Sequence, residues 1–408
     1  MSINDFDPKA PATVECPYPF YQAMRTEAPV HKPSGHDFFI VSRYDDIQEV
    51  LLKPEVFSSQ FATGYRPSPA ALEIMRQGWL PAHTLLTNDP PAHRRFRSLV
   101  NKAFTPRRVA LLEPSIRTIA SELIDSFIGA GRVELVHQFA VPLPLTVIAD
   151  ALGVSRNDMP TFKRWSDDAV APIGGMIGPE RELECARSGL EFQRYFAREL
   201  DQRRDHPRDD ILTDLLNARL ENERPLDTGE MLNMLQQILV AGNETTTTLI
   251  ASAMLLLLQH PGHVDALRAD PARIPNFIEE ALRFESPVQG LSRVAKIDAR
   301  VGGVPIPAGA QLVLMYGSAN RDERHFAQPE KFEIDRENAR EHFAFGGGIH
   351  YCLGAPLARL EAKIGFELLL AKLGEIRLAA NLNDFTHTPS FTLRGLKALH
   401  LEFVAPRL

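Results

Sequence analysis

The stretch Phe345-Gly346-Gly347-Gly348-Ile349-His350-Tyr351-Cys352-Leu353-Gly354, residues 345–354, carries the strongest local signal in this sequence. Three consecutive glycines allow the backbone to approach a flat ligand closely, because no Cβ stands in the way. Cys352 comes just before a predicted helix whose first turn tolerates Pro356. The free N–H groups and the dipole at such a helix start favour a thiolate. One isolated thiolate suits the axial position of a metal centre, although a buried inert cysteine would show the same pattern.

Composition places the chain among ordinary globular proteins. It has 408 residues, of which 44% are hydrophobic and 24% charged, and a formal net charge of −7. These values exclude a disordered or fibrous protein and argue against nucleic acid as the main partner. Cys16, Cys185 and Cys352 are far apart and odd in number, so neither a disulfide framework nor a zinc ribbon fits.

No segment predicts export or membrane insertion. The N-terminal residues lack the basic segment and apolar run of a signal peptide. The most apolar stretch, residues 238–258, is interrupted by Glu244 and four threonines, and a charge is costly in lipid. We therefore expect a buried core helix without a membrane span, in a monomeric cytoplasmic protein.

Helical periodicity dominates the chain, and strand signals are short. Apolar spacing predicts helices over residues 109–130, 189–204, 211–220, 229–260 and 357–373. Strands are predicted at residues 38–41 and within 304–314, where two short runs meet at a Pro-Ala-Gly turn. A long irregular region, residues 321–348, leads to the last large helix. We expect one mainly α domain over residues 1–408, with small β-sheets.

Five positions of the cysteine loop match a known motif at fixed spacing. Phe345, Gly348, His350, Cys352 and Gly354 resemble the haem-binding signature FxxGx(H/R)xCxG of the cytochromes P-450, the haem-thiolate monooxygenases. The resemblance implies a triangular, α-rich prism with haem b, iron protoporphyrin IX, between a long central helix and the cysteine-loop helix. It also implies that Cys352 is the axial iron ligand and that the other four residues contact the cofactor.

Helix 229–260 carries an acid beside an alcohol. Ala241, Gly242 and Thr245 share one helical face, which is shallow and apolar apart from the hydroxyl. Glu244 adjoins them in an apolar segment, where a carboxylate is costly without a partner or a role. A packing glycine with threonines bonded to the preceding turn would give the same pattern. The run 241–245 resembles the family's AGx(D/E)T element, which implies that Ala241 contacts the haem, Thr245 orients oxygen and Glu244 supplies protons.

Glu280 and Arg283 are three residues apart on one helical face. Most pairs of this kind are solvated and contribute a few tenths of a kcal/mol. This pair resembles the family's ExxR element, which implies a buried charge network with Arg336 that fixes the cysteine loop. Loss of one member would then strand the others.

Donors for two carboxylates are predicted from three distant segments. His93 and Arg97 lie four apart on one face and resemble the family's HxxxR pattern, although a solvated basic face would look the same. Arg293 and His350 match two further family contacts. The resemblance implies that these four side chains hold the haem propionates.

Residues 93–108 reverse the charge of this acidic chain. The segment contains no acid and six cations: Arg94, Arg95, Arg97, Lys102, Arg107 and Arg108. No nucleic-acid-binding motif accompanies them. We interpret the segment as a docking surface for an acidic electron carrier, extended by Arg359 and Lys363.

Substrate contacts are predicted from position along the chain. The candidates are Gln237, Val240, Val288, Gln289, Leu291, Phe391 and Thr392. Most are apolar, which favours a small or medium hydrophobic substrate, and the two glutamines either anchor it or bond to backbone. Residues 61–79 are expected to form a flap over the ligand, and residues 171–178 a mobile lid.

The leading interpretation is a monooxygenase that inserts one atom of O2 into such a substrate. The sequence shows no GxGxxG loop or flavin-type domain, so a separate ferredoxin or flavodoxin with its NAD(P)H reductase is expected to supply electrons. A peroxide-using or rearranging haem enzyme is an alternative, against which the acid–alcohol pair argues. A haem-free helical scaffold is another. A thiol hydrolase fits less well, because His350 and Cys352 lie two residues apart without an orienting carboxylate.

Overall fold

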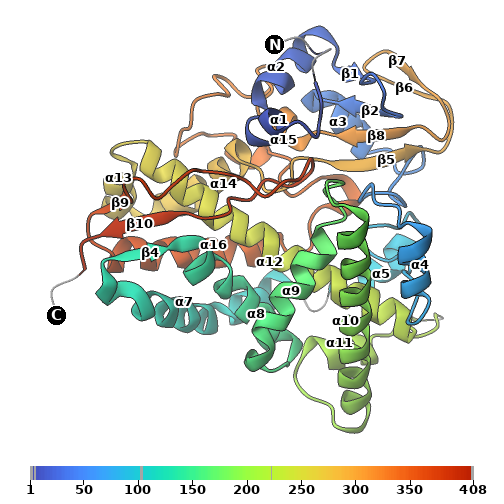
Figure 1. Ribbon diagram of the computed structural model, residues 1–408, viewed down its shortest axis with the longest axis horizontal. Helices are drawn as coiled ribbons and strands as arrows, with labels where there is room; N and C mark the ends of the chain where they lie inside the picture. Colours follow the sequence, from blue (N-terminus) through green and yellow to red (C-terminus); the bar gives the residue numbers. More distant parts are fainter. Residues whose placement is uncertain (1–2, 4–5, 102–103, 222, 406–408) are drawn as a thin grey trace.

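The structure, a computed structural model, describes residues 3, 6–101, 104–221 and 223–405. Figure 1 shows the N-terminal segment and the largest sheet at the top of the view and most of the long helices below them. Helix α12 (Thr228–Gln259) runs through the middle and packs against helices from both halves of the chain. The mainly α fold with small sheets is confirmed.

Helices precede and follow this central element. Those before it are α1 (Pro11–Glu15), α2 (Tyr18–Glu27), α3 (Tyr44–Leu51), α4 (Pro69–Met75), α5 (Ala92–Asn101), α6 (Pro106–Leu111), α7 (Glu113–Phe127), α8 (Pro142–Leu152), α9 (Met159–Val170), α10 (Pro179–Asp205) and α11 (Ile211–Asn217). Those after it are α13 (His263–Ala269), α14 (Ile274–Phe284), α15 (Tyr316–Ala319) and α16 (Ala355–Lys372).

The strands form small sheets. They are β1 (Val30–His31), β2 (Phe38–Val41), β3 (Phe57–Ser58), β4 (Arg132–Glu134), β5 (Leu291–Ala295), β6 (Ala299–Val301), β7 (Val304–Ile306), β8 (Gln311–Leu314), β9 (Ile376–Leu378) and β10 (His400–Phe403). The largest sheet has the order β1-β2-β8-β5-β3, with β2 parallel to β8 and Ile40 opposite Val313. The others are β4-β10-β9 and β6-β7.

Helix α12 begins at a reciprocal cap. The Glu230 N–H donates to Asp227 Oδ1 and the Asp227 N–H donates to Glu230 Oε2, each at 2.9 Å. Its second half is buried almost throughout, which fixes it as the rod against which the site is built. In the described part of the chain, no helix combines the length and apolar character needed to cross a membrane.

Two predicted helices have different bounds. The segment 109–130 is divided between α6, α7 and a short turn at Ile128–Ala130, because Pro114 cannot donate an N–H to continue α6. The segment 189–204 is part of the longer α10, which starts at Pro179. The central helix and α16 agree with prediction to within two residues, and α11 ends three residues early.

The run 304–314 does not form one strand pair. β7 pairs with β6, whereas β8 enters the largest sheet between β2 and β5. Gly309 turns the chain between them with φ +83°, and its N–H donates to Ala295 O at 2.8 Å. The predicted turn therefore sends the second run to a different sheet, which is a correction.

Candidate active site

The cysteine loop is closed at its base. The Cys352 N–H donates to Phe345 O at 2.9 Å. Gly348 adopts φ +60°, and a Cβ at this position would overlap with the backbone oxygen of Leu51 on α3. Glycine is therefore required here for packing against α3. This packing is a second reason for glycine in the loop, beside the predicted close approach to a flat ligand.

Cys352 lies three residues before α16, whose cap is Gly354. The N–H groups of Gly354 and Ala355 bond to its sulfur. Burial nevertheless raises the pKa of the Cys352 thiol, and these N–H groups and the charges of Arg97 and Arg359 only oppose the rise. The N–H groups at the helix start thus favour the thiolate, as expected, but act against burial, and a metal cation on the sulfur would complete the deprotonation.

The four predicted propionate donors converge in the structure. His350 comes from the cysteine loop, His93 and Arg97 from α5 and Arg293 from β5. The ring centroids of His93 and His350 are 4.3 Å apart. Burial, followed by the charges of Arg293, His93 and Arg97, lowers the pKa of His350 to about 3. Distant segments thus bring two arginine charges together with two histidine rings whose pKa values are lowered, so that His350 is neutral at physiological pH.

This donor cluster fits an anionic group. His350 Nε2 is buried and has no hydrogen-bond partner among the described residues. Arg293 is also buried, and it bonds to Ser292 O and the Tyr316 hydroxyl. Buried polar atoms are normally paired, and the charged groups that act on His350 are all basic. The carboxylates of haem would supply the missing acceptors.

The middle of α12 is accessible to a ligand. Ala241 is exposed although the helix crosses the centre of the molecule. Nothing lies within 4 Å of the position that a Cβ on Gly242 would take. Thr245, one turn further on, is half-buried. Open space therefore borders this helix face, as the spacing of the small residues predicted.

Comparisons with known proteins agree with this arrangement. The family model "cytochrome P-450" matches residues 190–374. The cytochrome P-450 monooxygenase PikC of Streptomyces venezuelae is 36% identical over 393 residues, which cover 95% of this chain and 91% of the relative. The chain belongs to the cytochrome P-450 family.

Solved P-450 structures share the fold. Cytochrome P-450 CREJ, in complex with (4-ethylphenyl) dihydrogen phosphate, superposes with a TM-score of 0.93 at 33% identity and covers 99% of this chain and 100% of its own. CYP109E1 from Bacillus megaterium, in complex with testosterone, gives 0.83 at 35% identity, covering 95% and 99%. The protein is therefore a P-450 monooxygenase, an oxidoreductase that uses haem iron, O2 and a small organic substrate.

The acid and the alcohol of this P-450 point in different directions. The Thr245 hydroxyl donates to Ala241 O at 2.7 Å. Glu244 Oε1 lies 3.3 Å from Lys163 Nζ and 3.4 Å from Ser166 Oγ, both on α9. Burial raises the pKa of Glu244, the Lys163 charge lowers it and the Asp167 charge raises it. Lys163 lies far from Glu244 in sequence, so no local pattern indicated it, and α9 brings it to the acid.

A second acid was also missed. Glu361 on α16 is buried and bonds to Thr246 of α12. Burial raises its pKa to about 8, although the Thr246 hydroxyl acts against this. Its position on the apolar stripe of helix 357–373, between Leu357 and Ile364, was the available signal.

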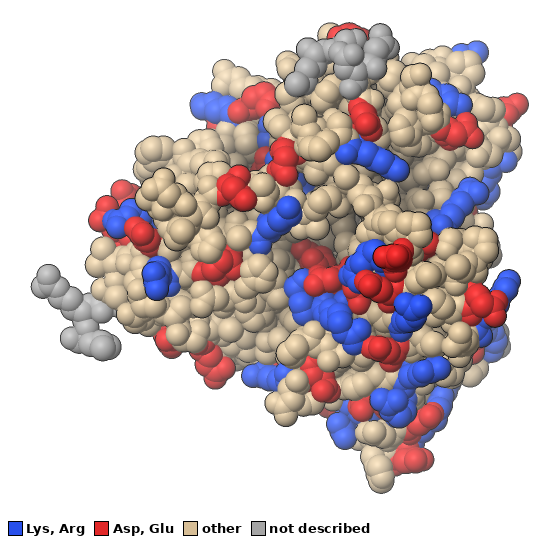
Figure 2. Space-filling view, viewed as in Figure 1, with Lys and Arg blue, Asp and Glu red and all other residues tan. Residues whose placement is uncertain are grey.

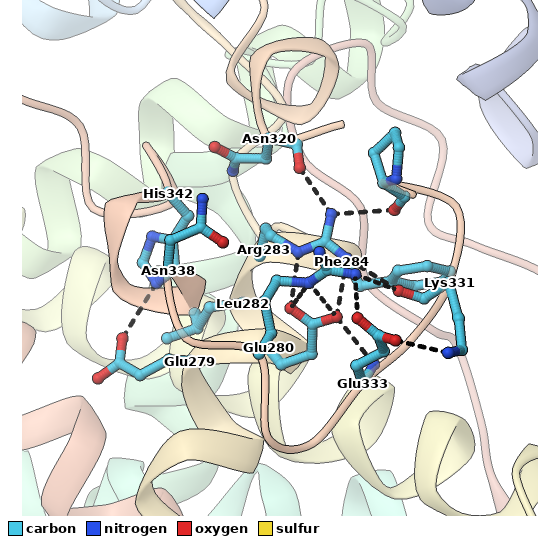
Figure 3. Close-up of polar contacts among 12 residues, drawn as sticks. Glu279, Glu280, Leu282, Arg283, Phe284, Asn320, Lys331, Glu333, Asn338 and His342 are labelled. Carbon is cyan, nitrogen blue, oxygen red and sulfur yellow. Dashed lines mark hydrogen bonds and ion pairs between the residues drawn. The ribbon is translucent and has the colours of Figure 1, made fainter. Parts of the chain in front are cut away.

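The predicted Glu–Arg network is present and fully buried. Arg283 Nε and Nη2 donate to the two Glu280 oxygens at 2.6 and 2.8 Å, and Arg336 Nε lies 3.1 Å from both. Figure 3 shows how Arg283 also reaches the backbone around Asn320 and Lys331. The network binds α14 to the segment that precedes the cysteine loop.

The predicted substrate residues are only partly brought together. Gln237 Nε2 donates to Thr84 Oγ1 at 2.7 Å and its Oε1 accepts from the Leu86 N–H at 3.0 Å. Gln289 is buried and donates to Ser286 O at 2.7 Å. Both glutamines therefore bond to the protein's own chain, which favours the second of the two alternatives left open for them over the role of substrate anchor.

The other predicted substrate contacts lie in different parts of the structure. Phe391 packs against the rings of Phe6 and Phe38 in an N-terminal cluster and is half-buried, so its contact with substrate stays a prediction. The side chains of Val288 and Leu291 pack on the core of the largest sheet. Val240 is half-buried on α12, and the buried hydroxyl of Thr392 has no partner within the part of the chain that the structure describes; both residues stay predicted substrate contacts.

The predicted flap, residues 61–79, contacts α10, and the predicted lid, residues 171–178, lies against the C-terminal turn. The Tyr65 hydroxyl donates to Glu182 at 3.0 Å, and the Trp79 N–H donates to Gln193 Oε1 at 2.9 Å. In the lid loop, a Cβ on Gly174 would lie 2.9 Å from Ser390 Oγ. Figure 2 shows a hollow in the centre of this face, with side chains of both charges along its edge.

Fewer cations of residues 93–108 are available to a docking partner than the sequence indicated. Arg95 is paired with Glu223 at 2.8 Å, and Arg108 with Asp214 at 2.6 Å. Arg97 Nη1 donates to Tyr351 O at 2.9 Å. Arg359 is bound to Glu279, Lys363 lies 3.4 Å from Glu367, and Lys102 falls outside the described residues. Arg94 and Arg107 are exposed.

Proposed function

We propose that this P-450, a single domain over residues 1–408, uses haem b to insert one atom of O2 into a small or medium hydrophobic substrate. The observation that carries the proposal is the convergence of His93, Arg97, Arg293 and His350 beside the loop that ends at Cys352. When bound, haem iron supplies the activation of oxygen. All other tasks fall to the chain's own side chains.

Binding of the cofactor is assigned to two groups of residues. Cys352 Sγ is the proposed iron ligand, and the N–H groups of Gly354 and Ala355 stabilise its negative charge. The four basic side chains are proposed to bind the propionates, with His350 Nε2 gaining the partner that it lacks among the described residues. Phe345 and Ala241 are the proposed apolar contacts, and Gly348 and Gly354 the backbone ones.

Thr245 and Glu244 are proposed to manage protons. The Thr245 hydroxyl holds a proton at Oγ1 and turns from Ala241 O toward the substrate side when it donates. Glu244 keeps a quarter of its side chain exposed, so protons from water can reach its carboxylate beside Lys163. The raised pKa of Glu244 makes it a proton donor nearer neutral pH than an ordinary glutamate.

The electron supply is proposed to be a separate ferredoxin or flavodoxin with its NAD(P)H reductase. Arg94 and Arg107 are exposed, and Arg97, three residues after Arg94, touches the residue before Cys352. An acidic carrier would be attracted to this side at low salt. We propose that the monomeric protein works in the cytoplasm, where NAD(P)H is present.

The substrate class rests on composition and on relatives. Val240 and the open face at Ala241 and Gly242 offer an apolar lining. Two relatives are known in complex with testosterone and with (4-ethylphenyl) dihydrogen phosphate. From these ligands we infer for this chain only that the substrate contains an apolar ring.

The deciding experiment is the absorption spectrum of the reduced, CO-bound protein, with Cys352→Ser as the variant. We expect the red-shifted Soret band of a thiolate ligand in the wild type and its loss in the variant. A histidine-like band in the wild type, or a variant with an unchanged band, would overturn the proposal. Product formation with NADH and a ferredoxin system, compared with peroxide alone, separates the two haem-enzyme candidates.

A further inference from the structure

We propose that Glu279 and Arg359 are positioning residues that hold the two ends of the cysteine loop together. The proposal rests on the proposed function, in which Cys352 is the iron ligand. The Glu279–Arg359 pair is distinct from the Glu280 network. With this role, Arg359 no longer belongs to the predicted docking surface for an electron carrier.

Glu279 is a buried carboxylate on α14 with strong partners. Arg359 Nε donates to its Oε1 at 2.7 Å and Arg359 Nη2 to its Oε2 at 3.0 Å, a bidentate pair between α14 and α16. Burial would raise the pKa of Glu279, but the hydrogen bonds from His342 and Arg359 lower it to about 2. The carboxylate is therefore ionised and oriented across the working pH range.

His342 joins this carboxylate to the chain just before the loop. Its Nε2 lies 3.1 Å from Glu279 Oε2, and its Nδ1 accepts the Ala344 N–H at 3.2 Å. Because Nδ1 accepts, the ring hydrogen is on Nε2 and donates to the carboxylate. Figure 3 shows His342 and Glu279 facing each other on the side of α14 away from the Arg283 contacts.

Arg359 contacts both ends of the loop at once. Its Nη1 donates to the Tyr351 hydroxyl at 3.0 Å, next to Cys352 in sequence. Its guanidinium carbon lies 4.5 Å from the centroid of the Phe345 ring. Phe345 O accepts the Cys352 N–H at 2.9 Å, so the guanidinium bridges the same two ends that this hydrogen bond closes.

Neighbouring acids of α14 thus hold successive parts of one segment. Glu280 holds the stretch around Arg336, and Glu279 holds His342 and, through Arg359, the residues on either side of the loop. Only a planar, forked cation can bind a carboxylate bidentately, donate to a hydroxyl and stack on a ring together. This is the physical reason for arginine at position 359.

The test compares Glu279→Gln and Arg359→Gln in the haem-loaded protein. We expect hydrogen exchange at the Cys352 amide to become about tenfold faster in both variants, since each loses hydrogen bonds to a charged group. Arg340→Gln is the matched control, because Arg340 also faces Glu279, at 3.6 Å, but is 71% exposed in its side chain. Exchange in this control is expected to stay at the wild-type rate.

The haem reduction potential separates positioning from simple charge. A pure charge effect would shift the potential upward in Glu279→Gln and downward in Arg359→Gln, with loop exchange unchanged in both. That result would overturn the proposal. Faster exchange in only one of the two variants would also overturn it, because the pair is proposed to act as a unit.

Tyr351→Phe provides a second test in case Glu279→Gln or Arg359→Gln does not fold. Tyr351 is 41% exposed, and the substitution removes only its hydroxyl contact to Arg359. We expect the amide of Cys352 to exchange several-fold faster, by less than in Arg359→Gln. An unchanged rate would contradict the proposal. A wild-type protein without the thiolate spectrum would instead contradict the proposed function, so the two failures are distinguishable.

Discussion

Lys163 Nζ on α9 lies 3.3 Å from Glu244 Oε1 on α12, so the acid beside Thr245 in sequence is held by a neighbouring helix. Lys163 also pairs with Asp167, one turn further along α9. The pair of acids and the single lysine form a partly exposed cluster. Its charge balance, and with it the proton affinity of Glu244, depends on the packing of α9 against α12.

Lys163→Met is expected to destabilise the protein by about 1–2 kcal/mol at pH 7.5, less than a fully buried pair because each side chain is about a quarter exposed. Glu244 already has a raised pKa, so the folded state loses stability as pH rises above the ordinary value of 4.5. Loss of the lysine raises the pKa of Glu244 further. The loss of unfolding free energy in Lys163→Met, relative to the wild type, is therefore smaller at pH 5 than at pH 7.5. Urea unfolding at both pH values measures this, with the exposed pair Lys53–Glu49 as control through Lys53→Met. An equal loss of unfolding free energy at both pH values would contradict the conclusion that Lys163 sets the pKa of Glu244.

Thr245→Ala is expected to reduce the product formed per NAD(P)H consumed by roughly tenfold or more, because a positioned proton-transfer group contributes about 10²–10⁴ in rate. Thr245→Ser keeps the hydroxyl that bonds to Ala241 O and should retain most of the coupling. Product and NAD(P)H are measured in the same reaction. Unchanged coupling in the alanine variant would remove the role proposed for Thr245.

Glu361→Gln is expected to stabilise the protein at neutral pH. The folded-state pKa of about 8 exceeds the ordinary 4.5, so stability is lost as pH rises from 4.5 toward 8. Glutamine keeps a partner for Thr246 and cannot ionise. The gain should approach roughly 3 kcal/mol at pH 7 and vanish near pH 4.5. Denaturant unfolding across this range measures it, and a variant that is less stable at pH 7 would sink the prediction.

Gly348→Ala is expected to prevent formation of the cysteine loop. Its φ of +60° costs an alanine about 1–2 kcal/mol, and the new Cβ would overlap with Leu51 O. Gly347→Ala is the control, because its φ of −162° suits any residue and its Cβ would meet side chains rather than backbone, namely Leu51 at 3.1 Å and the Phe343 ring at 3.5 Å. The CO-bound spectrum should lose the thiolate band in the first variant and keep it in the second. The reverse order would contradict the packing argument.

Gln193→Ala is expected to release the flap from α10. The Gln193 side chain accepts the Trp79 N–H at 2.9 Å and donates to Trp79 O at 2.7 Å. Loss of two hydrogen bonds of about 1 kcal/mol each should speed exchange of the Trp79 amide by roughly 10- to 30-fold. Gln202→Ala, at an exposed position of the same helix, is the control. Equal exchange in both variants would show that the flap is held elsewhere.

The motifs were predictable wherever local spacing determines the chemistry. The cysteine loop, the Glu280–Arg283 pair and the span of α12 follow from residues close together in sequence. The partners of Glu244, Gln237 and Glu279 were not predictable, because Lys163, Thr84 and Arg359 lie on other elements. Helical spacing says which face a side chain is on but not which neighbour that face meets.

The sequence by itself determined the family, the iron-ligand candidate Cys352 and the succession of helices, because motif spacing and apolar periodicity are properties of the chain. Only the tertiary structure decided that β7 and β8 enter different sheets, that Phe391 packs beside Phe6 and Phe38 and that Arg359 contacts both ends of the cysteine loop. Charges and hydrogen-bond donors act over a few ångströms, and the chain's packing sets which of them come within that range.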